Sequence, residues 1–167
     1  STPTWAMNPF NYCLGLLKNT NHISWTLFKL MIPIIIMIKV LEELGLVMLI
    51  SEWLSPVMLW VGLPGSMGLV WATALITNLY GGIVVYASLA ADVPMTVAQV
   101  TIISSMMLIA HALPIEARIA QKAGVRISLT LLLRVGMAIV FGILFNQIYL
   151  ITDTLQQPAV LLWAPDS

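Results

Sequence analysis

The sequence predicts an all-α integral membrane protein with three full spans, an interfacial helix and a re-entrant helical hairpin. Hydrophobic residues make up 60% of the 167 residues and charged residues 8%, whereas soluble domains carry about 25% charged residues. Several apolar runs are long enough to cross a bilayer. Another is interrupted at its centre by "TNLYGG" at residues 77–82, which favours a hairpin. The alternative is four full spans.

The balance of charged residues indicates which kinds of molecule the chain can bind. Seven basic and seven acidic residues give a net charge of zero, and no basic tail or stripe is present. Nucleic acid is therefore not an expected partner, and the lipid bilayer is. The single cysteine, Cys13, permits no internal disulfide.

The chain is predicted to be one membrane domain, residues 1–167. Residues 1–22 are expected to form an interfacial lead, because Phe10 and Tyr12 suit the headgroup layer. The membrane core covers residues 23–151. Its first span is expected at residues 23–41, which is roughly 28 Å of helix and close to the ~30 Å hydrocarbon thickness. Pro33 should kink this helix.

The later elements follow from apolar runs separated by breaks. Acidic residues and tryptophans after the first span indicate its continuation and then a helix along the membrane plane. In order, the expected elements are the interfacial helix within 42–65, a break at "GLPG" (62–65), the interrupted segment 66–91, a span over 96–112, an amphipathic helix over 113–124, a span over 125–151 and a surface tail over 152–167.

The distribution of charge favours the hairpin over a fourth crossing. If residues 66–91 turn back, the basic side chains fall on one side of the membrane and the acidic ones on the other; a crossing splits the basic set, against the positive-inside tendency. A hairpin tip in lipid leaves backbone groups unpaired, so it must be buried in protein or line a wet cavity. This requirement argues for a second copy or a related subunit. The basic set is Lys18, Lys29, Arg118, Lys122 and Arg126, and the acidic set is Glu52, Asp92, Asp153 and Asp166.

Polar groups at membrane depth are the candidate binding residues. Asn78 and Tyr80 could hold a solute or ion, or they could bond the backbone freed by the break. Gly81 and Gly82 permit close backbone approach to a ligand or to another helix.

Ser104 and Ser105 lie near the middle of the following span. They could contact the same solute, or they could hydrogen-bond to their own helix, as serines in helices often do.

A second group of residues suggests gating or ion pairing. Arg134 lies about 12 Å along the last span from Arg126 and needs a carboxylate, for which Glu42, Glu43 and Glu116 are the candidates. Lys39 is spaced to pair with Glu43.

His111 is expected to act as a pH-sensitive gate or a backbone cap. The chain has no helical HExxH pair and no nucleophile elbow. Neither catalysis nor a metal or other cofactor is therefore expected.

Two runs carry a resemblance to a known family. "GLPGSMGLVWATALITNLYGGIVVYASL" and "LIAHALPIEARIAQKAGVR" are similar to the nucleoside-recognition, or gate-domain, family of membrane proteins, which includes spore-maturation and stand-alone bacterial inner-membrane members. The resemblance covers residues 30–145. It implies an interfacial helix, a re-entrant hairpin and a broken span. By position, it points to Thr77, Asn78 and Tyr80 as solute contacts.

Two functions are therefore expected from the sequence. The first is a gate-type transport protein of the bacterial cytoplasmic (inner) membrane, multi-pass, which assembles with a second copy or a paralogous subunit to bind or pass a small polar solute or ion. The alternative is a non-catalytic accessory subunit of a larger membrane complex. The sequence names neither the solute nor the absolute orientation.

Overall fold

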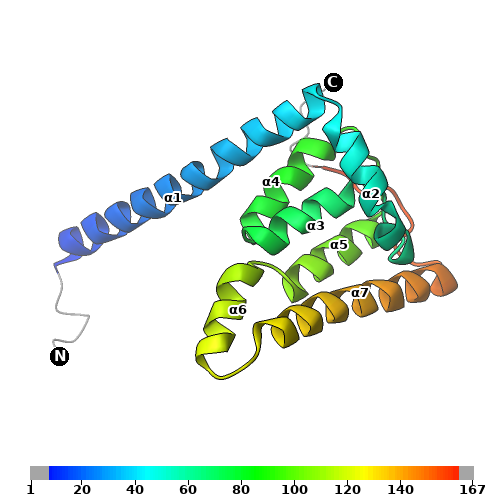
Figure 1. The fold of residues 1–167 in the computed structure, drawn as a ribbon. Coiled ribbons are helices and arrows are strands. Elements are labelled where there is room, and N and C mark those ends of the chain that lie inside the picture. Colours follow the sequence, from blue (N-terminus) through cyan, green and yellow to red (C-terminus); the bar gives the residue numbers. More distant parts are fainter. Residues whose placement is uncertain (1–7, 162–167) are drawn as a thin grey trace.

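The computed structural model describes residues 8–161, and every helix or strand element among them is an α-helix (Figure 1). Predictions for residues 1–7 of the lead and 162–167 of the tail lie outside the described residues. The all-α class is confirmed. The helices are α1 (Pro9–Glu43), α2 (Leu46–Trp60), α3 (Met67–Ile76), α4 (Leu79–Leu89), α5 (Val97–Ile109), α6 (Leu113–Lys122) and α7 (Ile127–Thr152).

Helix α1 includes residues 9–22 of the predicted interfacial lead. It is 35 residues long and begins at Pro9, so these residues are helical and continuous with the first span. Proline is tolerated in a first turn, where its missing N–H has no helical partner. Pro33 lies inside the same continuous helix. At 1.5 Å per residue α1 is about 52 Å long, so it must tilt or extend beyond a ~30 Å hydrocarbon layer.

Helix α2 turns sharply away from α1. The chain breaks at Gly45, which has a φ of 70°, a conformation that glycine adopts without steric cost. Helix α2 then runs across the direction of α5 and α7 (Figure 1). Its tryptophans Trp53 and Trp60 are exposed, as suits the interfacial helix predicted here. The predicted break at residues 62–65 is confirmed, with Gly62 at a φ of 74°.

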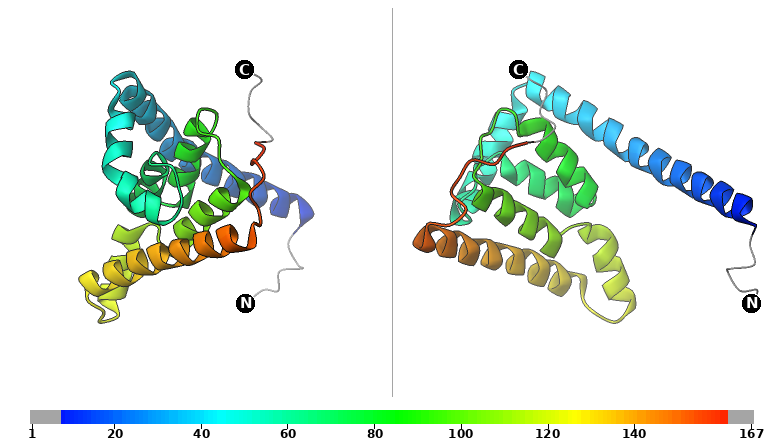
Figure 2. Two further views of the ribbon diagram at one scale, coloured as in Figure 1. Left: turned by 90° about the vertical axis from the view of Figure 1, so that its right-hand side faces the viewer. Right: turned by 180° about the vertical axis from the view of Figure 1, so that it is seen from behind.

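Helices α3 and α4 form the predicted hairpin. They are 10 and 11 residues long, about 15 Å each and half of a hydrocarbon core. The chain reverses between them at residues 77–78, and the two helices pack side by side (Figures 1 and 2). A straight fourth span through this segment, the alternative prediction, does not fit this reversal.

The hairpin is enclosed largely by its own chain. Helix α3 packs against α2, α5 and α6, and α4 packs against α1. Most of α3 is buried, from Met67 to Trp71 and again at Thr73 and Ala74. The chain itself therefore supplies the burial of α3, whereas a second copy or related subunit at the hairpin tip stays a prediction. The exposed edge of the hairpin is small and includes Ile76, Tyr80 and Ile83.

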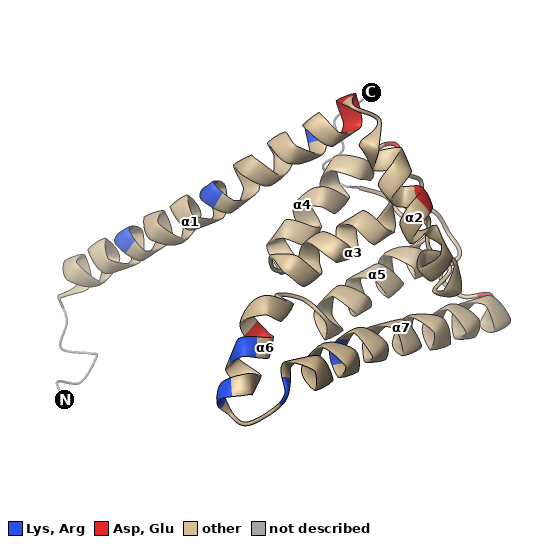
Figure 3. Cartoon of the chain, in the orientation of Figure 1, with Lys and Arg blue, Asp and Glu red and all other residues tan. Residues whose placement is uncertain are grey.

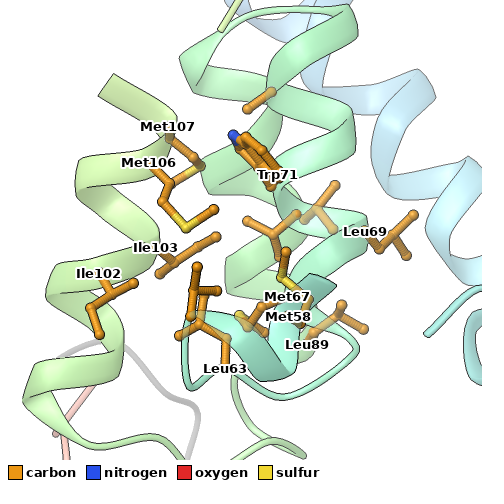
Figure 4. Packing of buried hydrophobic residues seen from close by; sticks show 14 of the residues in the cluster. Met58, Leu63, Met67, Leu69, Trp71, Leu89, Ile102, Ile103, Met106 and Met107 are labelled. Carbon is orange, nitrogen blue, oxygen red and sulfur yellow. The ribbon is translucent and has the colours of Figure 1, made fainter. Parts of the chain in front are cut away.

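The core lies where α2, α3, α4 and α5 meet. Its largest fully buried side chains include Met58, Met67, Ile103 and Met106, each at most 1% exposed. Figure 4 shows Met106 and Met107 beside Trp71, and Met58 and Met67 close to each other farther from the ring. Methionine is flexible enough to fill irregular gaps between crossing helices. This packing fixes the position of the hairpin relative to α5.

Three helical segments are long and apolar enough to cross a membrane: Pro9–Glu43, Val97–Lys122 and Ile127–Thr152. The second comprises α5 and α6 and is interrupted at residues 110–112, where Ala112 has a φ of 48°. The predicted span over 96–112 is therefore shorter, because α5 ends at Ile109. Helix α6 ends as predicted before Gly124, whose φ is 93°.

The charges separate as the hairpin predicts. Lysines and arginines lie between the start and the middle of α1 and around α6, whereas most acidic residues lie at the end of α1, along α2 and after α7 (Figure 3). Two exceptions, Lys39 and Glu116, are both paired with an opposite charge. Lys39 Nζ contacts Glu42 Oε2 at 2.9 Å, so the predicted pairing with Glu43 is wrong by one position.

The described part of the tail, residues 153–161, returns to the start of α5. Val97 N–H donates to Gln157 O at 3.0 Å, and Ala98 N–H donates to Leu155 O at 2.8 Å. The first N–H groups of a helix have no partner within the helix. The tail therefore completes the hydrogen bonding of α5, which gives the predicted surface strap a structural role.

We expect Gln99→Ala to destabilise the fold more than Thr96→Ala. The two residues form a capping box, and Gln99 Nε2 also donates to Gly62 O at 3.0 Å, joining α5 to the loop before α3. Loss of an N-cap costs about 1 kcal/mol, and Gln99→Ala loses the second contact as well. Thermal unfolding in detergent checks this. Thr101→Ala, which removes only a bond to Val97 O, is the control and should change little.

Candidate functional site

Two helix breaks lie beside each other in the structure. One separates α3 from α4 at Thr77 and Asn78, and the other separates α5 from α6 at residues 110–112. A hydrogen bond from Ala112 N–H to Ala74 O, 2.9 Å long, joins them. Interrupted helices at membrane depth are tolerated only where protein or a polar cavity satisfies the freed backbone. This pair of breaks is therefore the candidate functional site.

The polar residues of the first break bond their own backbone. Thr77 Oγ1–H donates to Thr73 O at 2.7 Å, and Asn78 Oδ1 accepts from Gly81 N–H at 3.0 Å. Asn78 is thus the N-cap of α4, a position where asparagine is strongly preferred. These bonds agree with the interpretation in which the polar residues of "TNLYGG" bond the backbone freed by the break. They leave the Asn78 amide NH2 without a hydrogen-bond partner in residues 8–161.

The two glycines of the motif permit close packing. A Cβ on Gly82 would lie 2.7 Å from both Ala74 Cβ and Met107 Sδ, and one on Gly81 would collide with Thr77 Oγ1. Both positions are buried. Gly82 therefore lets α4 approach α3 and α5 closely. Gly81 leaves room for Thr77 and for Ile34 of α1, as the packing interpretation predicts.

Tyr80, Ser104 and Ser105 do not gather with Asn78 into one binding site. Tyr80 is 56% exposed at the hairpin's outer edge. Ser105 Oγ–H donates to Thr101 O at 2.7 Å and lines a groove between α5 and α7. Ser104 makes no side-chain hydrogen bond to any described residue. The structure thus places Thr77, Asn78 and the glycines at the break and Ser105 against α7.

Two side chains, His111 and Arg134, donate hydrogen bonds to backbone carbonyls at the second break. His111 Nδ1–H donates to Met107 O at 2.8 Å, and Arg134 Nη1–H donates to Ile109 O at 3.0 Å. The last carbonyls of a helix are unpaired and carry partial negative charge, so donors and cations are favourable there. His111 therefore serves as the backbone cap that the sequence predicts as one of its two roles.

Glu116 completes a small charged network across the same break. Its Oε2 lies 2.7 Å from Arg134 Nη2, and its Oε1 lies 3.8 Å from His111 Nε2. Glu116 is also in the first turn of α6, where a carboxylate complements the positive end of the helix. The predicted neutralisation of Arg134 is confirmed, with Glu116 as the partner and not Glu42 or Glu43.

Several residues in and around this site carry no distinguishing signal in the sequence. Ala112 adopts a left-handed conformation and bonds Ala74, although neither alanine carries a distinguishing signal. Trp71 is 6% exposed beside Met106 and Met107 (Figure 4), and its Nε1–H has no partner in residues 8–161. A tryptophan within an apolar run cannot be told from a packing residue by sequence alone.

Metal-binding groups are not found in the part of the chain that the structure describes. No three His, Cys, Asp or Glu side chains gather within it. The polar atoms of both breaks instead suit hydrogen bonding and charge pairing within the fold.

A curated relative supports the membrane assignment. The chain is 31% identical over 126 residues to an uncharacterized membrane protein, YvoD, from Bacillus subtilis (strain 168). The chain is a membrane protein. The match covers 75% of this chain and 39% of YvoD, so the chain spans about two fifths of that relative's length. No protein-family model matches the chain, and no solved structure matches it.

Proposed function

We propose that this membrane protein is a gate-type transport subunit of the bacterial inner membrane. The observation that carries the proposal is the meeting of two interrupted helical segments at the Ala74–Ala112 hydrogen bond. Transporters commonly place substrate and ion sites at discontinuous helices near the bilayer midplane. The resemblance of residues 30–145 to the gate-domain family supports the same function.

The solute in this proposal is a small polar molecule or an ion. The free amide of Asn78 is the group at the first break that remains available to it, since Thr77 is used internally. The exposed hairpin edge at Ile76, Tyr80 and Ile83 would face a second copy or a paralogous subunit, which would complete the far wall of the site. No catalysis is included in this function.

We expect Asn78→Ser to reduce flux while preserving the fold. Serine keeps an N-cap oxygen but lacks the amide NH2, and one lost hydrogen bond weakens solute binding about fivefold. The measurement is proteoliposome swelling and flux with urea, glycerol, uridine and potassium chloride as probes. Ser88→Ala, which removes a helical hydroxyl bonded to Val84 O, is the matched control.

Equal flux through the Asn78→Ser and native proteins would contradict this assignment of Asn78. Flux no higher than that of empty liposomes for every probe would contradict transport of these solutes by the chain alone. A second copy is tested separately by the mass of the protein in mild detergent.

An accessory subunit is the second candidate, and the closed breaks favour it. His111 and Arg134 already satisfy carbonyls at the second break, and Asn78 caps the first. A break satisfied in this way can serve packing alone. Co-purification with a larger complex, together with no flux by the isolated chain, would support this role.

A further inference from the structure

A groove beside the two breaks combines an apolar lining with a basic edge. It lies between α3, α6 and α7 and has a volume of about 360 Å³, within the usual range of small-molecule sites. Leu75, Leu113, Ala117, Ile127 and Leu131 supply apolar surface, and Arg118 is the charged residue of the lining. A long apolar ligand with one anionic group matches this lining.

Two further cations extend the basic edge. Lys122 follows Arg118 by one helical turn, and Arg126 directly precedes Ile127 of the groove. All three cations are exposed, and none forms an ion pair within residues 8–161. Glu116, the carboxylate of α6, is paired with Arg134 instead. The cluster Arg118, Lys122 and Arg126 therefore keeps its charge available to a ligand.

The outer surface of α6 indicates that this groove meets lipid. Ile115 and Ile119 are 62% and 63% exposed and lie one turn apart on the side away from the body, flanking the cations. A helix with apolar and basic residues on its outer surface is suited to the headgroup boundary. An acyl chain could enter the groove from the bilayer while its headgroup stayed at that boundary.

The charge distribution selects the leaflet. Figure 3 shows the basic residues around α6 and along α1 apart from most acidic residues, and the positive-inside tendency places a basic side in the cytoplasm. The cytoplasmic leaflet carries negative surface potential from anionic lipids, and basic pockets between helices bind anionic lipid headgroups.

We propose that this groove binds one anionic phospholipid. One acyl chain lies along the apolar lining between α3, α6 and α7, and the phosphate lies against Arg118, Lys122 and Arg126. The groove adjoins both helix breaks, since Leu75 and Leu113 directly follow Ala74 and Ala112 in the sequence, but lipid binding does not depend on the transport proposal.

The test measures how tightly the full chain retains phosphatidylglycerol and phosphatidylcholine in mild detergent, by native mass spectrometry during lipid titration. Arg118→Gln should weaken phosphatidylglycerol about fivefold, and the triple Gln variant of the cluster about a hundredfold, since each cation near the surface contributes about 1 kcal/mol. Phosphatidylcholine should be affected much less. Leu131→Trp, which fills the groove, should weaken both lipids.

Lys18→Gln is the matched control, because Lys18 is an exposed cation of α1, a helix that does not pack against α6. It should leave phosphatidylglycerol retention unchanged. An equal loss for Lys18→Gln and Arg118→Gln would overturn the site in favour of general surface charge. Equal affinity for both lipids, or displacement of phosphatidylglycerol by inorganic phosphate alone, would overturn it as well.

Discussion

Arg134→Met is expected to destabilise the protein by about 2 kcal/mol. The substitution keeps the apolar stem of the side chain but removes the 2.7 Å contact with Glu116 and the hydrogen bond to Ile109 O. Removing one partner of a fully buried pair costs about 3–5 kcal/mol, because the other charge is left unpaired. The Arg134 and Glu116 side chains are 42% and 27% exposed, so a smaller loss is expected. In a chain of this length it corresponds to a fall in Tm of about 4–8 °C.

A double-mutant cycle separates the ion pair from the lost packing. Glu116→Gln in the Arg134→Met background removes the unpaired carboxylate, so the double variant should unfold at a higher temperature than Arg134→Met alone. Arg126→Met is the control, since Arg126 is exposed and forms no ion pair among the described residues. Equal losses for Arg126→Met and Arg134→Met would show that the pair contributes nothing to stability.

The sequence predicts the fold where a strong physical signal exists. Apolar runs locate the long helices, and Gly62 and Gly124 end elements where they are expected to. The separation of charge correctly favours the hairpin, because orientation in a membrane depends on where lysine and arginine lie. The sequence limits the ion-pair partner of Arg134 to three candidate carboxylates, because an unpaired charge at this depth is costly.

The remaining features depend on tertiary contacts that leave no local pattern. The start of α1 at Pro9 leaves no apolar pattern in the sequence, because residues 9–22 contain polar side chains that a helix accommodates without difficulty. The break before α6 falls at Ala112, a residue that rarely adopts φ > 0. Its bond to Ala74 forms only once α3 and α5 have packed. The sequence likewise does not show how far the chain encloses its own hairpin, because this enclosure depends on contacts between helices that are distant in sequence.

The close packing at Gly82 leads to the second large expected effect. In Gly82→Ala the added methyl group would lie 2.7 Å from Ala74 Cβ and from Met107 Sδ. The Met107 side chain can move, but Ala74 Cβ is fixed to the backbone of α3, so α4 must shift away from α3. Overpacking of this kind costs about 1–3 kcal/mol. Thermal unfolding in detergent should therefore show a clear loss of stability.

Gly136→Ala provides the opposite expectation for the same chemical change. Gly136 is also helical, but nothing lies within 4 Å of its Cβ position. Alanine is favoured over glycine in a helix interior by about 0.5–1 kcal/mol, so this control should be slightly stabilising.

Ala74→Gly should partly rescue Gly82→Ala by removing the colliding methyl group. A Gly82→Ala protein as stable as the native one would mean that α4 is free to move against α3 and α5, as a gate in the strict sense requires. A destabilised variant that Ala74→Gly rescues would instead mark Gly82 as a fixed packing contact, with any movement confined to the exposed tip at Tyr80.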